Sequence, residues 1–154
     1  MRAGLRAGGH PNVFLDSDDL DEITLSESGY DQLQWVAPIE KVWVENIDVR
    51  IDLIADSNTR SLTGIDPAKQ RLRQTSRLDL RQTFIKRSAE GSLRWTLTNY
   101  PCHAYAQEAD MSLRDYEDFV YAATFADQPD PIKCWQEVHD RQSERVQHPL
   151  GLHL

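Results

Sequence analysis

Histidine and cysteine are the side chains that most often hold transition-metal ions in proteins. The 154-residue sequence has two cysteines and five histidines: Cys102, Cys134, His10, His103, His139, His148 and His153. Two ligands on one helix lie three or four residues apart, as in H-x-x-x-H, and no histidine pair has that spacing. Cys134 and His139 are five residues apart, which places them poorly for one helical face. We therefore predict no metal-ligating residue in this chain.

Carboxylates and hydroxyls are the next candidates for chemistry. Asp16–Glu22 reads DSDDLDE, which has acidic residues as a calcium loop does but lacks the glycine and the bidentate Glu of an EF-hand. We interpret it as the acidic start of a helix, where negative charge is favourable. Gly91-Ser92 lacks the G-x-S-x-G pattern of a nucleophilic serine, and neither cysteine has a motif that lowers its pKa. The sequence thus assigns no catalytic residue and leaves the substrate-binding residues unknown.

The charges are unevenly distributed along the chain. Between Asp16 and Asp56 there are twelve acidic and two basic residues, whereas between Asp66 and Arg94 there are eight basic and three acidic ones. One interpretation is two solvated faces of opposite sign. Another is that the basic helix meets an acidic surface, within the chain or on a partner. A phosphate site is a third option, with less support because no glycine-rich loop accompanies the arginines.

Composition excludes several classes of protein. The chain is 40% hydrophobic and 27% charged, with a formal charge of −8, as expected for one acidic globular domain. No apolar run approaches the roughly 20 residues of a membrane span, and no secretory signal is recognisable. Two cysteines do not make a disulfide framework and suit a reducing cytosol. The acidic balance argues against binding to nucleic acid or to anionic membranes.

Periodicity and turn residues predict the elements of the first 60 residues. Residues 1–7 favour a short helix that Gly8-Gly9 ends. Asn12–Leu15 is a short apolar run, which favours a buried strand. From Ser17 to Glu45 the pattern is helical and broken at Pro38. Between Ile47 and Ala55 apolar and charged residues alternate, which predicts a strand with the side chains of Ile47, Val49, Ile51 and Leu53 on its buried face.

The remaining elements are predicted in the same way. Asp66 as N-cap and Pro67 at the first position begin a long helix that runs to about Ala89 and ends at Gly91. A second alternating strand covers 93–98. Ser112, with an acidic residue three positions later, caps a helix, and another begins near Pro131. The segment His148–Leu154 is rich in turn residues. The expected fold is α/β, with a short, mostly parallel sheet flanked by helices and a helical C-terminal third.

One long stretch resembles a known family. Thr98-Asn99-Tyr100-Pro101, Ala106-Gln107-Glu108-Ala109, Met111-Ser112-Leu113 and Tyr116–Ala122 resemble, in order, motifs of the aminopeptidase T family of metallopeptidases. Arg94-Trp95, Asn58-Thr59-Arg60, Thr63–Pro67 and Gly9–Val13 are similar to earlier motifs of that family. The similarity is colinear from about Leu5 to Trp135. It departs at Asp110, where the family favours glycine, and the tail after Val146 does not obviously follow it.

The resemblance implies a cytoplasmic enzyme that removes N-terminal residues from peptides with two divalent metal ions, such as zinc or cobalt. Such ions polarise the scissile carbonyl and generate hydroxide from bound water. The family is usually homodimeric, and its metal ligands lie in a C-terminal domain. Under this resemblance, residues 1–154 are expected to be one incomplete N-terminal domain, without the metal-binding domain and inactive alone. The alternative is a non-catalytic α/β module for binding or dimerisation. Exposed apolar surface is expected near both termini.

Overall fold

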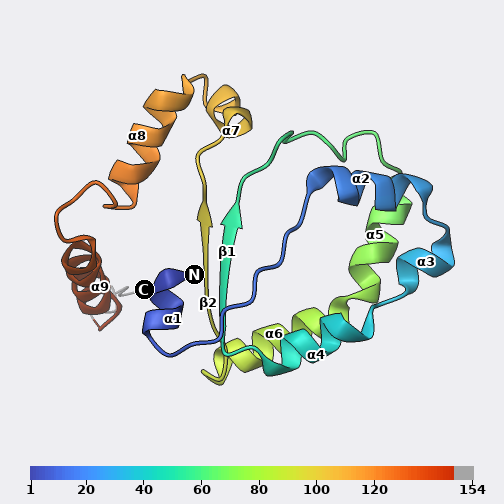
Figure 1. The fold of residues 1–154 in the computed structure, drawn as a ribbon, viewed down its shortest axis with the longest axis horizontal. Helices are drawn as coiled ribbons and strands as arrows, with labels where there is room; N and C mark the ends of the chain where they lie inside the picture. The colour runs from blue at the N-terminus through green and yellow to red at the C-terminus, as the bar shows by residue number, and fades with distance from the viewer. Residues whose placement is uncertain (148–154) are drawn as a thin grey trace, which may run out of the picture. The chain divides into compact units, whose positions relative to one another are not determined.

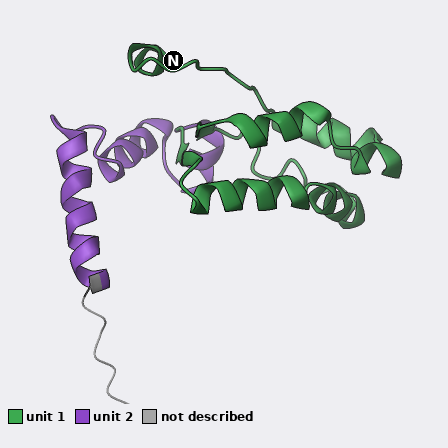
Figure 2. Cartoon of the chain, turned by 90° about the horizontal axis from the view of Figure 1, so that it is seen from below, with its two compact units in different colours: residues 1–100 green, residues 101–154 purple. Residues whose placement is uncertain are grey.

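A computed structural model describes residues 1–147 of the chain, in two compact units (Figure 2). Unit 1 comprises Met1–Tyr100 and unit 2 begins at Pro101. The elements of unit 1 are α1 (Arg2–Arg6), α2 (Asp18–Glu27), α3 (Tyr30–Gln34), α4 (Pro38–Asn46), β1 (Val49–Ile54), α5 (Pro67–Ser76), α6 (Leu78–Ala89) and β2 (Arg94–Asn99), as Figure 1 shows. Those of unit 2 are α7 (His103–Glu108), α8 (Leu113–Ala123) and α9 (Pro131–Gln147). The predicted α/β class and helical C-terminal third are confirmed.

The sheet of unit 1 is one parallel pair. β1 and β2 lie side by side with Arg50 next to Trp95 and Asp52 next to Leu97, and the helices α5 and α6 connect them. Such a crossover is required because parallel neighbours cannot be joined by a tight turn. The ladder ends where the Tyr100 amide donates to the carbonyl of Ile54 at 2.7 Å, just before Pro101.

The strand at 49–54 is confirmed, but the prediction of its buried face is wrong. Val49, Ile51 and Leu53 are 50%, 65% and 67% exposed, while Arg50 and Asp52 are half-buried. The helices explain this reversal, because the rings of Trp43 on α4 and Phe84 on α6 both lie against the guanidinium of Arg50. The charged face of β1 is therefore the one that the helices cover.

The predicted strand at Asn12–Leu15 is also wrong. Within residues 1–147 neither strand pairs with this run, and Val13, Phe14 and Leu15 are 65%, 60% and 93% exposed. Phe14 is attached to the rest of unit 1 through its side chain, since its ring centroid lies 4.8 Å from that of Trp43. An apolar run needs a neighbouring strand edge to become a strand, and sequence periodicity does not supply one.

The predicted helix from Pro67 to Ala89 is interrupted at Arg77. Its start is confirmed, because the Asp66 carboxylate accepts from the Ala68 amide at 2.8 Å, and so is its end at Gly91, where φ is +74°. At Arg77 the amide donates to the carbonyl of Gln74, which closes α5 with a tight turn before α6 begins. The result is two shorter helices rather than one.

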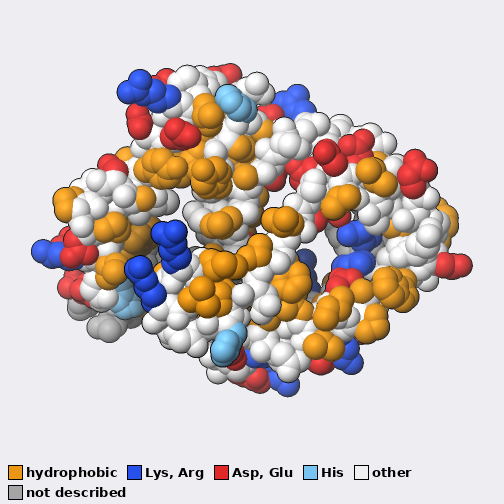
Figure 3. Space-filling view, in the orientation of Figure 1, with side chains coloured by type: hydrophobic (Ala, Val, Ile, Leu, Met, Phe, Trp, Pro, Cys, Tyr) orange, Lys and Arg blue, Asp and Glu red, His pale blue; other side chains and the backbone are white. Residues whose placement is uncertain are grey.

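The apolar core is small and lies between pairs of helices. In unit 1, α3 packs on α5 and α4 packs on α6, and the buried side chains are those of Leu25, Leu33, Val44 and Leu93. Many other hydrophobic side chains are spread over the face of the molecule seen in Figure 3. Leu5 near the start of the chain and Val146 near the end of α9 are 57% and 81% exposed, which confirms the predicted exposure near both termini.

The described part of unit 2, residues 101–147, contains the helices α7, α8 and α9. The hydroxyl of Ser112 accepts from the Asp115 amide at 3.1 Å, which confirms the predicted cap of α8. Ala104 and Ala106 of α7 are buried. The predicted turn-rich segment at His148–Leu154 lies outside the described residues. Among residues 1–147, no helix has the length and apolar character of a membrane span.

Candidate functional site

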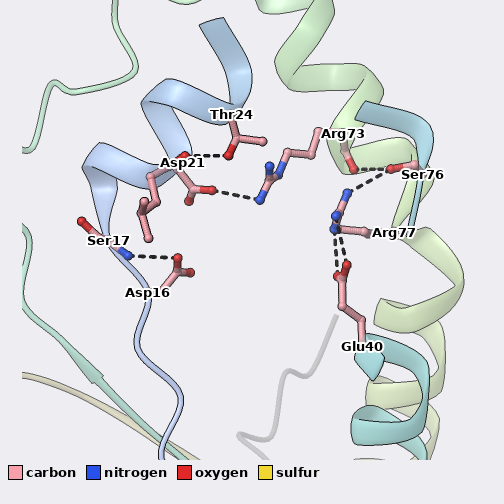
Figure 4. A network of polar contacts seen from close by, with 9 residues as sticks. Asp16, Ser17, Asp21, Thr24, Glu40, Arg73, Ser76 and Arg77 are labelled. Carbon is pink, nitrogen blue, oxygen red and sulfur yellow. Dashed lines mark hydrogen bonds and ion pairs between the residues drawn. The ribbon is translucent and has the colours of Figure 1, made fainter. Parts of the chain in front are cut away.

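A group of charged and polar contacts in unit 1 joins α2, α4 and α5 (Figure 4). We call it the acidic–basic network: Asp21, Glu40, Arg73, Ser76 and Arg77. Arg73 Nη2 lies 2.9 Å from Asp21 Oδ1. Arg77 donates from Nε and Nη2 to the two oxygens of Glu40 at 3.0 and 3.1 Å. The single hydroxyl proton of Ser76 is shared between the carbonyl of Arg73 at 2.8 Å and that of Leu33 at 3.1 Å. The basic helix thus meets an acidic surface within the chain.

Local sequence places each member of the network. Asp21 lies in the first turn of α2, where a negative charge is favoured by the helix dipole. Glu40 is the third residue of α4 and also accepts from the Ala37 amide at 3.1 Å, which satisfies a backbone donor at the start of that helix. Arg73 and Arg77 are four residues apart, so a helical turn brings them to the same side of the chain.

The network contains two ion pairs, Asp21 with Arg73 and Glu40 with Arg77. The four charged side chains are about a third exposed, from 27% to 37%, so solvent screens their attraction in part. The pKa of Asp21 is raised above its usual value by burial of the carboxyl and then by the negative charge of Asp16, although the positive charge of Arg73 opposes both. Both carboxylates already accept hydrogen bonds from guanidinium groups, so the arrangement braces three helices against one another.

A second charged group lies on the helix-covered face of β1. The guanidinium carbon of Arg50 is 5.3 Å from the centre of the Trp43 ring and 5.5 Å from that of Phe84. Arg50 Nε also donates to both oxygens of Asp52 at 2.9 Å. This is a cation–π contact to two rings combined with an ion pair, which holds α4 and α6 over the strand. The sequence does not predict this contact, since no spacing rule links two rings on different helices to one arginine.

The described residues do not fit a two-metal centre. Within residues 1–147, no three His, Cys, Asp or Glu side chains are grouped so that they could hold a metal ion. His10, His103 and His139 are exposed and lie on separate segments, and Cys102 and Cys134 are half-buried. His148 and His153 lie outside the described residues. The candidates within residues 1–147 are not gathered into one site.

The motif that carries the family resemblance forms the start of unit 2. Ala104 and Ala106 are 8% and 2% exposed, which accounts for small residues at those positions of α7. The amide of Met111 donates to the Ala106 carbonyl at 2.9 Å, and Asp110 has φ +53°. This is the left-handed helix end that glycine adopts most readily, and the family favours glycine there. Asp110 keeps that conformation without being glycine.

These features define the chain as an α/β protein whose charged side chains pair within unit 1. A family model described as thermophilic metalloprotease (M29) matches residues 1–149, nearly the whole chain. The chain therefore belongs to the M29 family of metallopeptidases, the aminopeptidase T family that its motifs resemble. A search of curated protein sequences returns no match to it. Membership of a metallopeptidase family implies metal use by the family.

Proposed function

We propose that this chain is part of a metal-dependent aminopeptidase that removes N-terminal residues from peptides, and that residues 1–147 serve as its scaffold. The observation that carries the proposal is the match of the M29 family over residues 1–149. The acidic–basic network supports the scaffold role, because its two carboxylates are paired with arginines rather than presented to a ligand. Under the proposal, polypeptide outside these residues supplies the ligands for two divalent ions such as zinc or cobalt, and the described part is inactive alone.

A hydrolysis assay tests this proposal. The purified 154-residue chain is mixed with an aminoacyl-p-nitroanilide in the presence of zinc or cobalt, and release of nitroaniline is followed. The expected result is no release above that of the metal ions without protein, with an active aminopeptidase as positive control in the same buffer. Metal-dependent release that co-purifies with the chain and disappears on chelation would contradict the scaffold role.

We also propose that the chain forms a homodimer, and that the peptidase of which it is part acts on peptides in the cytoplasm. Support for self-association is the exposed apolar face of β1, formed by Val49, Ile51 and Leu53, since parallel sheets are normally covered on both faces. Cys102 and Cys134 form no disulfide, which is the state expected of cysteines in a reducing compartment.

The homodimer proposal makes a prediction about Ile51. Ile51→Lys places a charge in the middle of the exposed face, so it should weaken self-association by about tenfold or more without unfolding the chain. Sedimentation velocity over a range of concentrations measures the effect. Ile23→Lys is the matched control, because Ile23 is 58% exposed on α2, close to the 65% of Ile51. A wild-type chain that remains monomeric, or an equal effect of both variants, would contradict the proposal.

A further inference from the structure

The turn that follows α8 contains a residue in an unfavourable backbone conformation. Phe125 has φ +57°, its amide donates to the Ala122 carbonyl at 3.1 Å, and the amide of Ala126 donates to the Tyr121 carbonyl at 2.8 Å. This left-handed helix end suits glycine, and a bulky aromatic residue adopts it at a cost. Asp110 at the end of α7 has the same geometry, with φ +53°.

Two contacts from α9 accompany this strained residue. The ring of Trp135, on the second turn of α9, lies 5.4 Å from the Phe125 ring at an interplanar angle of 79°, which is the edge-to-face arrangement that aromatic pairs favour. Trp135 Nε1 also donates to the carbonyl of Thr124, the residue before Phe125, at 3.0 Å. Asp110 has no aromatic ring, so the two left-handed helix ends differ in that only Phe125 can make an aromatic contact.

The rest of α9 is largely solvated. Ile132 at its start and Val146 near its end are 83% and 81% exposed, and Trp135 itself is 50% exposed. The ring contact and the indole hydrogen bond tie the N-terminal part of this 17-residue helix to the end of α8. These two contacts thus fix the direction of α9 near its N-terminal end.

We infer that Phe125 and Trp135 form a latch that sets the direction of α9 relative to α8. The free-energy cost of the Phe125 backbone conformation is similar in size to the free energy gained from the aromatic contact and the hydrogen bond. The closed latch is therefore only modestly favoured. When the latch opens, Phe125 relaxes to an ordinary backbone conformation, the Trp135 indole is released to solvent, and α9 turns about residues 125–130. The inference concerns α8 and α9 alone and does not depend on the proposed peptidase function.

Electron–electron distance measurement tests the latch directly. Spin labels are introduced through non-natural amino acids at Asp118 on α8 and Glu144 on α9, both exposed, so that Cys102 and Cys134 remain unchanged. Trp135→Ala should broaden the label-to-label distance distribution about twofold or more, because both contacts are lost. Trp135→Phe, which keeps a ring but loses the N–H donor, should give an intermediate width.

Asp110→Gly is the matched control, since it changes a left-handed helix end of the same geometry at the end of α7 rather than between α8 and α9. It should leave the distance distribution unchanged. Circular dichroism of every variant should show the helix content of the wild type. A Trp135→Ala chain with the wild-type distribution, an Asp110→Gly chain that broadens it equally, or a loss of helix in Trp135→Ala would each overturn the inference.

Discussion

At the scale of single residues, Asp21 illustrates how an ion pair and an elevated carboxyl pKa coexist. Arg73 lies 2.9 Å from Asp21 and favours the charged carboxylate, but burial and the nearby Asp16 disfavour it more strongly. The ionised form of Asp21 is therefore less favourable in the folded chain than in the unfolded chain. The contact with Arg73 reduces this penalty without removing it.

This balance predicts a particular pH dependence. Because the pKa of Asp21 is higher in the folded state than the unfolded value of 3.8, the folded chain binds the proton more tightly. The contribution of Asp21 to the free energy of unfolding is therefore fully present below pH 3.8 and is lost as the pH rises through the raised pKa. In Asp21→Asn this contribution is absent. Urea unfolding of both chains from pH 3 to pH 7 measures the difference.

The expected outcome is a wild-type free energy of unfolding that falls relative to that of Asp21→Asn as the pH rises through this window. A difference that changes in the opposite direction would indicate that Arg73 dominates, with a lowered pKa. Asp19→Asn serves as the control, because Asp19 is an exposed neighbour on the same helix turn and should not alter the profile.

At the scale of elements, the junction between α5 and α6 is where α3 and α4 are attached to these two helices. Arg77 stands at this junction and donates two hydrogen bonds to Glu40 of α4, while the neighbouring Ser76 donates to the Leu33 carbonyl. Arginine is suited to this position because its guanidinium matches both oxygens of a carboxylate at once. The break between α5 and α6 and the ion pair with Glu40 therefore occur at the same residue, Arg77.

We predict that Arg77→Ala lowers the free energy of unfolding by about 1 kcal/mol, since the pair is bidentate but partly exposed. Chemical denaturation measures this value, and a double-mutant cycle with Glu40→Gln isolates the pairwise part. Lys86→Ala is the matched control on α6, because Lys86 is 76% exposed and lies 3.9 Å from Glu90. Equal losses in Arg77→Ala and Lys86→Ala would contradict the bracing role of the network.

Local features of the fold were predictable from the sequence, and long-range ones were not. The cap at Asp66, the helix end at Gly91 and the cap at Ser112 depend on residues within a few positions, so composition and spacing suffice to find them. The buried face of β1 depends instead on where α4 and α6 lie. The run at Asn12–Leu15 needed a strand partner, which no local pattern provides.

The same distinction applies to the candidate site. Opposite charge runs indicated that a basic helix could meet an acidic surface, and the pairs at Asp21 and Glu40 confirm that idea. Which arginine would meet which carboxylate depends on the packing of α2, α4 and α5, which the sequence does not specify. The contact of Arg50 with two aromatic rings went unpredicted for the same reason.

At the scale of the whole molecule, the chain combines membership of a metallopeptidase family with a described part that holds no metal-binding group. Its charged side chains brace helices, and an apolar sheet face remains exposed. Both features are the ones on which the proposed scaffold role rests. Under that proposal, residues 1–147 position other parts of a peptidase and do not hold its metal ions.

Metal content after equilibrium dialysis tests that claim most directly. The purified 154-residue chain is dialysed against micromolar zinc or cobalt, and the bound metal is measured by mass spectrometry against a bovine serum albumin reference and a buffer blank. The scaffold role predicts no stoichiometric metal on the chain. Two tightly bound ions per chain, retained after a further dialysis without metal, would contradict it.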